Sequence, residues 1–177
     1  TETGGVYGEE GYVYQLFDPL PEFDGYRPAL GAWIVGDASA GLGIRGLDHL
    51  GIAVESIAAA RSLYEVSLGA KFTGEEVVAE QKVRVAFFEL GDQAHPLRLE
   101  LLEPLDADSP IARFLERRGP GIHHVCYRVD DLDAALERAR DAGYRLVDDT
   151  PRIGAGGCRI AFLHPKSTAG ILIELTE

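Results

Sequence analysis

The chain has 177 residues, of which 46% are hydrophobic and 26% are charged, as is typical of one globular domain or of two small halves sharing a core. Its formal net charge of −12 argues against nucleic acid and anionic membranes as partners, although a local group of Arg and Lys could still hold an anionic substrate. No apolar run is long enough to span a bilayer and no signal peptide is recognisable, so we expect a cytoplasmic protein.

Residues 1–45 are rich in Gly, Pro and aromatic side chains, and they show no long helical or alternating hydrophobic pattern. Seven aromatic residues in this segment are too many for a purely disordered tail. We expect an extended arm of unknown function that packs across the main body or a partner subunit, with a short strand near Tyr12–Leu16. The alternative is a mostly mobile tail.

Residues 46–104 are predicted to form a strand, a helix and three further strands. The expected segments are 47–54, 55–70, 71–78, 82–90 and 97–104. The helix is indicated by Ile57, Ala60, Leu63, Tyr64 and Leu68 at helical spacing, and Gly69 is its stop signal. Residues 105–120 follow as a linking helix, with Asp108 and Ser109 as capping residues, Pro110 at the first helical position and Gly119 at its end.

Residues 121–177 repeat this order. A strand at 121–129 precedes an amphipathic helix that presents Leu132, Ala135, Leu136 and Ala139 on one face and ends at Gly143, and strands are expected within 144–149, 158–165 and 170–177. Both halves therefore have the order βαβββ, and two copies of one unit imply two similar sheets about a pseudo-two-fold axis. The predicted fold class is α+β, with a cupped mixed sheet in residues 46–177 and the N-terminal arm before it.

The repeat places chemically alike residues at matching positions. His124 follows His49 by 75 positions in the first strands, and Glu174 follows Glu100 by 74 positions in the last strands. Two imidazoles and two carboxylates suit a divalent ion such as Zn, Co, Ni, Mn or Fe, and four protein ligands leave two octahedral positions for water or a bidentate substrate.

A structural interpretation competes with this metal site. A single His on an apolar strand is usually a core residue, and a binding protein could repeat the same fold without metal. An ionised Glu between Leu and Ile is costly to bury without partners, however, and its repetition together with His favours the metal site.

The remaining histidines and the cysteines receive other roles. Because successive side chains of a strand point to opposite faces, His123 should face away from His124 unless the strand bulges. His95 is expected to be solvated, and His164 is expected either to cap a turn or to join the site. Cys126 and Cys158 are expected to be buried thiols rather than a disulfide.

Several segments resemble a known family in combination: "DHLGIAV", "GIHHV", "FLHPK" and the final "LIEL". Over residues 47–177 the chain resembles the methylmalonyl-CoA epimerases of the vicinal oxygen chelate superfamily, whereas residues 1–45 resemble no part of that family. The resemblance implies a homodimeric enzyme that interconverts the 2R and 2S epimers of an acyl-CoA through an enolate. It also implies a divalent metal, cobalt(II) first and Zn2+, Mn2+ or Ni2+ as alternatives, bound by His49, Glu100, His124 and Glu174.

Epimerisation needs a proton carrier on each face of the substrate. Glu174 is expected to carry the proton on one face and to bind metal as well. Some relatives have a Glu for the other face where an ungapped match places Val85, which cannot transfer a proton. The proton carrier on that face is then Glu100 or a metal-bound water. Glu80 or Gln81 could serve only if the register of the match were shifted. Some relatives have Gln at the position of Glu100, and Gln is also an oxygen donor.

The loop "PRIGAGGCR" and the following "HPKS" supply expected substrate contacts. The candidates are the basic residues Arg159 and Lys166, which supply positive charge, and the glycines Gly156 and Gly157. Glycine backbone can approach phosphate or acyl oxygens closely. A flexible connection between two strands is the alternative for this loop. Two other functions stay open: a glyoxalase-I-like lyase acting on a hemithioacetal, and a metal-free small-molecule binding protein of the same fold.

Overall fold

A computed structural model describes residues 34–35, 38–39, 41–92 and 94–177. The chain divides into two compact units, Thr1–Gly41 and Leu42–Glu177. The first unit contributes two short antiparallel strands to the described residues, β1 (Ile34–Val35) and β2 (Ala38–Ser39). The strand expected near Tyr12–Leu16 lies outside the described residues.

The second unit is built on one mixed sheet of eight strands. These are β3 (Ile44–Ala53), β4 (Lys71–Val78), β5 (Val83–Leu90), β6 (Leu97–Pro104), β7 (Gly121–Val129), β8 (Arg152–Ile153), β9 (Arg159–Leu163) and β10 (Ile173–Thr176). Their order across the sheet is β4-β5-β6-β3-β7-β10-β9-β8. In each half the first strand pairs in parallel with the last, β3 with β6 and β7 with β10, and the antiparallel pair of β3 and β7 joins the halves. The predicted α+β fold of two βαβββ units is confirmed.

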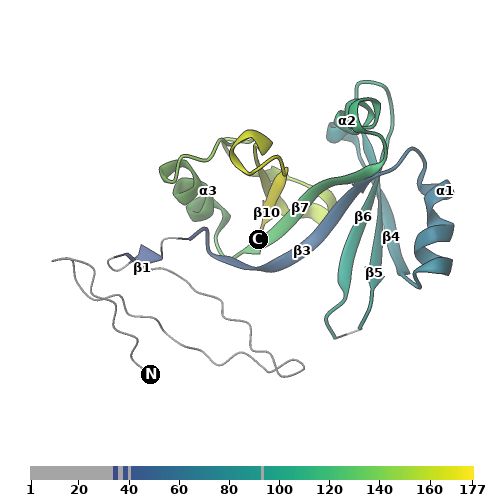
Figure 1. Ribbon diagram of the computed structural model, residues 1–177, viewed down its shortest axis with the longest axis horizontal. Helices are drawn as coiled ribbons and strands as arrows, with labels where there is room; N and C mark the ends of the chain where they lie inside the picture. Colours follow the sequence, from purple (N-terminus) through teal and green to yellow (C-terminus); the bar gives the residue numbers. More distant parts are fainter. Residues whose placement is uncertain (1–33, 36–37, 40, 93) are drawn as a thin grey trace. The chain divides into compact units, whose positions relative to one another are not determined.

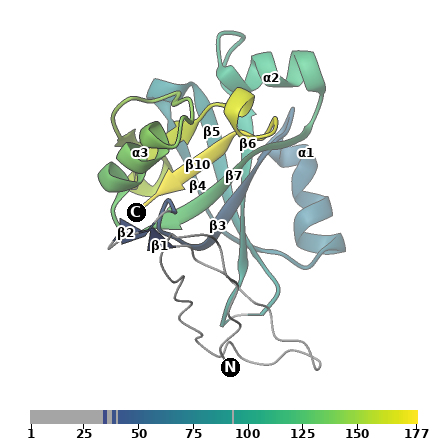
Figure 2. The ribbon, with the colours of Figure 1, turned by 60° about the vertical axis from the view of Figure 1, so that its left-hand side comes forward.

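Each half carries its helix on the outer face of the curved sheet, as Figures 1 and 2 show. Helix α3 (Leu132–Asp141) packs its buried side chains, Leu132, Ala135, Leu136 and Ala139, against β7, β9 and β10. Helix α1 (Ile57–Arg61) packs Ile57 against Phe88 of β5 and Leu101 of β6. The helix α2 (Pro110–Arg118) begins at the predicted cap Ser109, whose hydroxyl accepts from the Ile111 amide, and its Ile111 packs with Val83, Val85 and Leu102.

Two predicted elements differ from the structure. The first helix is α-helical only to Arg61 and continues as a π-helical turn, η1 (Ser62–Ser67). The strand expected at 144–149 is reduced to one bridge between Leu146 and Leu163, and β8 forms the sheet edge instead. A carboxylate explains the second difference: Asp148 accepts a hydrogen bond from the Phe162 amide at 3.0 Å and so takes the place of a backbone partner.

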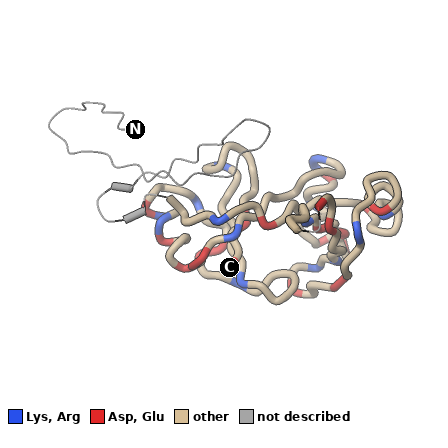
Figure 3. The backbone as a smooth tube through the Cα atoms, turned by 90° about the horizontal axis from the view of Figure 1, so that it is seen from below, with Lys and Arg blue, Asp and Glu red and all other residues tan. Residues whose placement is uncertain are grey.

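Three short 3₁₀ turns complete the second unit: η2 (Ala79–Gln81), η3 (Ala155–Gly157) and η4 (Pro165–Ser167). Basic and acidic residues are interspersed along the described chain in the view of Figure 3. Among the described residues, none of the helices combines the length and the apolar character that a membrane crossing requires.

Candidate active site

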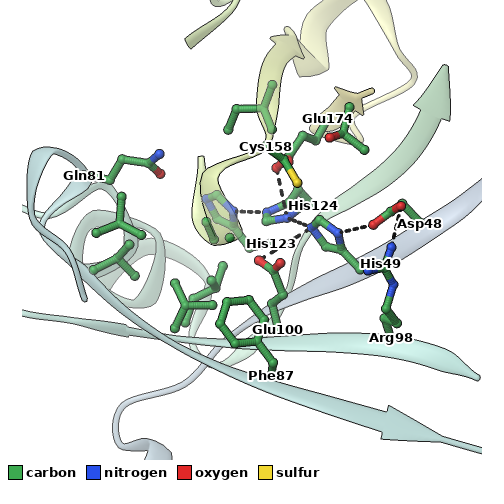
Figure 4. Close-up of a pocket in the computed structure, with 18 of the residues that line it drawn as sticks. Asp48, His49, Gln81, Phe87, Arg98, Glu100, His123, His124, Cys158 and Glu174 are labelled. Atoms are coloured by element: carbon green, nitrogen blue, oxygen red, sulfur yellow. Dashed lines mark hydrogen bonds and ion pairs between the residues drawn. The ribbon is translucent and has the colours of Figure 1, made fainter. Parts of the chain in front are cut away.

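Four side chains from both halves meet above the centre of the sheet (Figure 4). The Nε2 atoms of His49 on β3 and His124 on β7 lie 3.1 Å apart. An Oε2 atom of Glu100 on β6 lies 3.6 Å from Nε2 of His49, and an Oε2 atom of Glu174 on β10 lies 3.3 Å from Nε2 of His124. The ligand atoms of His49, Glu100 and His124 all lie within 4.8 Å of one another, and Glu174 adjoins this group through His124.

The β3–β7 ladder is irregular beside each of these histidines. Leu47 pairs with Tyr127 and His49 with Cys126, so that Asp48 is an extra residue; Gly51 pairs with His124 and Ile52 with Ile122, so that His123 is another. An extra residue shifts the alternation of a strand, and two successive side chains can then reach the same side. The expectation that His123 faces away applies only to a strand without a bulge; β7 does bulge, and His123 lies in the pocket wall.

Each histidine has an outer contact at its Nδ1 atom. Asp48 Oδ1 lies 3.1 Å from Nδ1 of His49, and Nδ1 of His123 lies 3.0 Å from Nδ1 of His124. The other oxygen of Asp48 accepts from Arg98 Nη2 at 2.7 Å and from Arg128 Nε at 2.8 Å. Burial raises the pKa of the Asp48 carboxyl, but its hydrogen bonds with His49 and Arg128 outweigh burial and keep it ionised.

The pKa shifts reflect a buried cluster of carboxylates and imidazoles. Burial raises the pKa of Glu174 to about 7, against the opposing effect of His49 and with a contribution from Glu100. Burial also raises the pKa of Glu100. Burial lowers the pKa of His123 to about 4, and burial together with the neighbouring imidazoles holds the pKa of His124 well below its usual value. Burial lowers the pKa of His49 too, but Asp48 and the two glutamates outweigh it and the net shift is upward.

His49, Glu100 and His124 could together hold a divalent cation, with Glu174 beside His124 as the fourth proposed ligand. Adjacent ligands about 2.1 Å from an octahedral ion are about 3.0 Å apart, and tetrahedral ligands are slightly further apart. The 3.1 Å separation of the two Nε2 atoms and the 3.3 Å separation of His124 from Glu174 lie in this range, and the 3.6 Å separation of His49 from Glu100 is slightly longer. Both outer contacts occupy Nδ1, which leaves each Nε2 lone pair for the ion. Room for His124 depends on Gly51, since a Cβ atom there would lie 2.1 Å from Cε1 of His124.

The cluster lies in a cavity of about 830 Å³ lined by both halves of the sheet. This volume is in the range of small-molecule and cofactor sites. Of the four expected substrate-contact residues, Gly156 lines the cavity, whereas Gly157, Arg159 and Lys166 do not. Arg159 is instead paired with Asp133 at 2.8 Å and with Glu177.

Three other expectations concern the second proton carrier, the cysteines and His164. Val85 is buried in the wall, with Glu80 and Gln81 also along it. Both cysteines are free, but only Cys126 is buried; Cys158 is exposed, and that part of the prediction is wrong. His164 caps η4 by accepting from the Lys166 amide at 3.0 Å, which confirms the turn-capping interpretation.

Sequence reasoning missed Asp48, Arg98, Arg128 and His123 as parts of this site. A signal existed for two of them, because Asp48 and His123 are separated by the same 75 positions as the two histidines that follow them. The arginines carried no such signal, since only the bulged strand turns Asp48 towards them.

Comparison with known proteins adds to this geometry. Residues 48–162 match the family model of the Glyoxalase/Bleomycin resistance protein/Dioxygenase superfamily. The ethylmalonyl-CoA/methylmalonyl-CoA epimerase of Cereibacter sphaeroides is 41% identical over 133 residues, which cover 74% of this chain and 96% of that protein. The chain belongs to the methylmalonyl-CoA epimerase family of this superfamily. A Bacillus subtilis relative, the uncharacterized protein YqjC, is 50% identical over 74% of this chain and 91% of its own length.

Solved structures of the family share the fold. Methylmalonyl-CoA epimerase from Mycobacterium tuberculosis has a TM-score of 0.72 and 41% identity, covering 81% of this chain and 92% of that one. A methylmalonyl-CoA epimerase in complex with methylmalonyl-CoA and NH4+ has a TM-score of 0.71 and 38% identity, covering 75% of this chain and 94% of that one. A related protein thus binds this substrate on the same fold.

The N-terminal residues resemble a different family. Residues 1–54 match the model of the glutathionylspermidine synthase preATP-grasp region. A putative acid–amine ligase of Haemophilus influenzae is 49% identical over 45 residues, which are 25% of this chain and 12% of that protein. The shared segment is thus a small part of the ligase, and none of the site residues described above lies in the unit Thr1–Gly41.

Proposed function

We propose that the protein is a metal-dependent epimerase that interconverts (2R)- and (2S)-methylmalonyl-CoA by removing the proton at C2. The observation that carries the proposal is the group of His49, Glu100 and His124, with Glu174 beside His124, in the lining of one cavity. Relatives of this family that bind or act on methylmalonyl-CoA support the choice of substrate.

A divalent cation bound by these four residues would act as a Lewis acid towards the thioester oxygen and the carboxylate of the substrate, and would stabilise negative charge that develops there. We propose cobalt(II) as the ion, with zinc, manganese and nickel as alternatives, because imidazole and carboxylate ligands suit all of them.

Glu174 is the proposed proton carrier on one face of C2. Removal of the proton leaves an enolate whose charge lies on the thioester oxygen, and return of a proton from the opposite face completes the inversion. Burial raises the pKa of this carboxyl to about 7 in the metal-free protein, and a bound cation would lower it, so that the ionised Glu174 would be able to accept the C2 proton.

Glu100 is the proposed carrier on the second face. It approaches the cluster from β6, in the other half of the sheet from Glu174, and burial raises the pKa of its carboxyl as well. Val85 forms the adjoining wall with an apolar side chain that cannot exchange protons.

The decisive experiment follows loss of C2 deuterium from methylmalonyl-CoA into water, with and without a chelator. We expect exchange that needs metal and that Glu174→Gln abolishes, while Glu116→Gln, at an exposed position on α2, leaves it unchanged. Exchange retained in Glu174→Gln would remove Glu174 from the mechanism.

The same preparation separates the alternative functions. Turnover of a glutathione hemithioacetal without turnover of the CoA ester would identify a glyoxalase-I-like lyase, and absence of metal by elemental analysis would identify a binding protein. A homodimer and a cytoplasmic location stay predictions.

A further inference from the structure

His123 is a second histidine at the pocket wall beside the proposed metal ligands. It is the extra residue of the β7 bulge, and its imidazole lies edge-on to the ring of Phe114, with the ring centres 5.0 Å apart. Its Nδ1 atom contacts Nδ1 of His124 at 3.0 Å. The mechanism proposed above does not use it.

The counterpart of His123 in the other half is Asp48, which precedes His49 as His123 precedes His124. In Figure 4 these two residues and the two histidines form a row, in the order His123, His124, His49 and Asp48. The carboxylate oxygen of Asp48 that does not contact His49 accepts hydrogen bonds from Arg98 and Arg128. His123 differs, because among the described residues no hydrogen-bond partner is recorded for its Nε2 atom, and the residue lines the cavity.

The contact between the two imidazoles constrains their hydrogens. If Nε2 of His124 gives its lone pair to a cation, the hydrogen of that ring is on Nδ1, and it is donated to Nδ1 of His123. A neutral His123 that accepts there carries its own hydrogen on Nε2. The Nε2–H group of His123 is then available as a hydrogen-bond donor in the cavity.

We infer that His123 is a substrate-contacting residue that donates from Nε2 to an oxygen of the acyl group, while its Nδ1 holds His124 in the tautomer that binds metal. The inference rests on the proposed function for the identity of the acyl group. The thioester oxygen and the carboxylate are the available acceptors, and a bond to the thioester oxygen would strengthen as the enolate charge develops. The competing interpretation is that His123 only packs against Phe114.

Substitutions can separate the two nitrogens of His123. The amide of Asn lies near the place of Nδ1 and that of Gln near the place of Nε2. His123→Asn should keep cobalt(II) affinity within about twofold while kcat/KM at saturating cobalt falls about 100-fold, the usual loss for one donor to a developing oxyanion. His123→Gln should lower cobalt affinity about 10- to 100-fold while its kcat/KM at saturating cobalt stays within about tenfold. His123→Phe should lose both properties.

Cobalt affinity is measured by competition with a chelator, and a thermal melt of each variant checks that it is folded. Equal behaviour of the Asn and Gln variants, whether both keep or both lose the two properties, would overturn the inference. A variant-independent check is ¹⁵N NMR of the zinc-loaded protein, in which His123 should be the Nε2–H tautomer; the Nδ1–H tautomer would also overturn it. If the unsubstituted protein shows no C2 exchange, the proposed function fails, whereas the cobalt and tautomer readouts still report on the His123–His124 contact.

Discussion

Gly51 shows how one missing side chain makes room for a proposed metal ligand. The ring of His124 fills the space where a Cβ atom of residue 51 would be, at 2.1 Å from Cε1, whereas a Cβ atom on Gly46 of the same strand would meet nothing within 4 Å. Gly51→Ala should therefore displace His124 and lower cobalt(II) affinity at least about tenfold. Gly46→Ala is the matched control and should leave the affinity unchanged. Equal cobalt(II) affinities of the two variants in titrations would contradict this prediction, because they would show that the His124 ring can move aside without loss of metal binding.

Glu174 gives a second prediction at the scale of one residue. Its pKa in the metal-free protein is about 7, above the ordinary value of 4.5, so the folded state holds a proton that the unfolded chain releases. The free energy of unfolding of the chelator-treated protein should therefore fall as pH rises from about 4.5 to about 7, by about 1 to 3 kcal/mol. Glu174→Gln should remove this component. Urea unfolding at pH 5 and pH 8 measures it, and an identical pH dependence in both proteins would contradict it.

At the scale of elements, a contact between the halves encloses the cavity. Glu76 on β4 accepts a hydrogen bond at 2.8 Å from the amide of Gly156 in η3, which belongs to the other half of the sheet. This bond connects the glycine-rich loop to the outer strand of the first half. Gly156 also lines the cavity, so the bond fixes part of the cavity wall.

Glu76→Ala should release this loop. We expect a several-fold rise in KM with little change in kcat, because the metal cluster is untouched, and faster hydrogen exchange at the Gly156 amide. Glu76→Gln keeps an acceptor oxygen and should behave nearly as the unsubstituted protein. Glu75→Ala is a second control, since Glu75 pairs instead with Arg84 at 3.3 Å. Unchanged exchange at Gly156 in Glu76→Ala would show that the bond does not hold the loop.

At the scale of the whole molecule, the two units have different relatives. All the proposed ligands and the three buried hydrophobic clusters lie in Leu42–Glu177. Removal of residues 1–41 should therefore leave the melting temperature and C2 exchange of the remaining unit nearly unchanged. A large loss of either would show that the first unit supports the site.

Light scattering on the same truncated protein measures its oligomeric state. This tests whether the N-terminal segment forms a contact between subunits. Fewer subunits per particle than in the full chain would support the expected arm across a dimer boundary. An unchanged number of subunits would contradict this role, and it would fit a segment related to the acid–amine ligase instead.

Periodicity and repetition in the sequence determined the two βαβββ units, because burial of one helix stripe and of alternating strand positions leaves a pattern in the residues themselves. The matched positions of His49 and His124, and of Glu100 and Glu174, followed from the same repeat. Only the tertiary structure decided that Asp48 and His123 join them, since a bulge is a property of the pairing of two strands and breaks the alternation that a single strand predicts. The loss of the strand at 144–149 has a similar cause: the side chain of Asp148, within this segment, replaces a ladder bond to Phe162, and only the pairing of the two segments shows this.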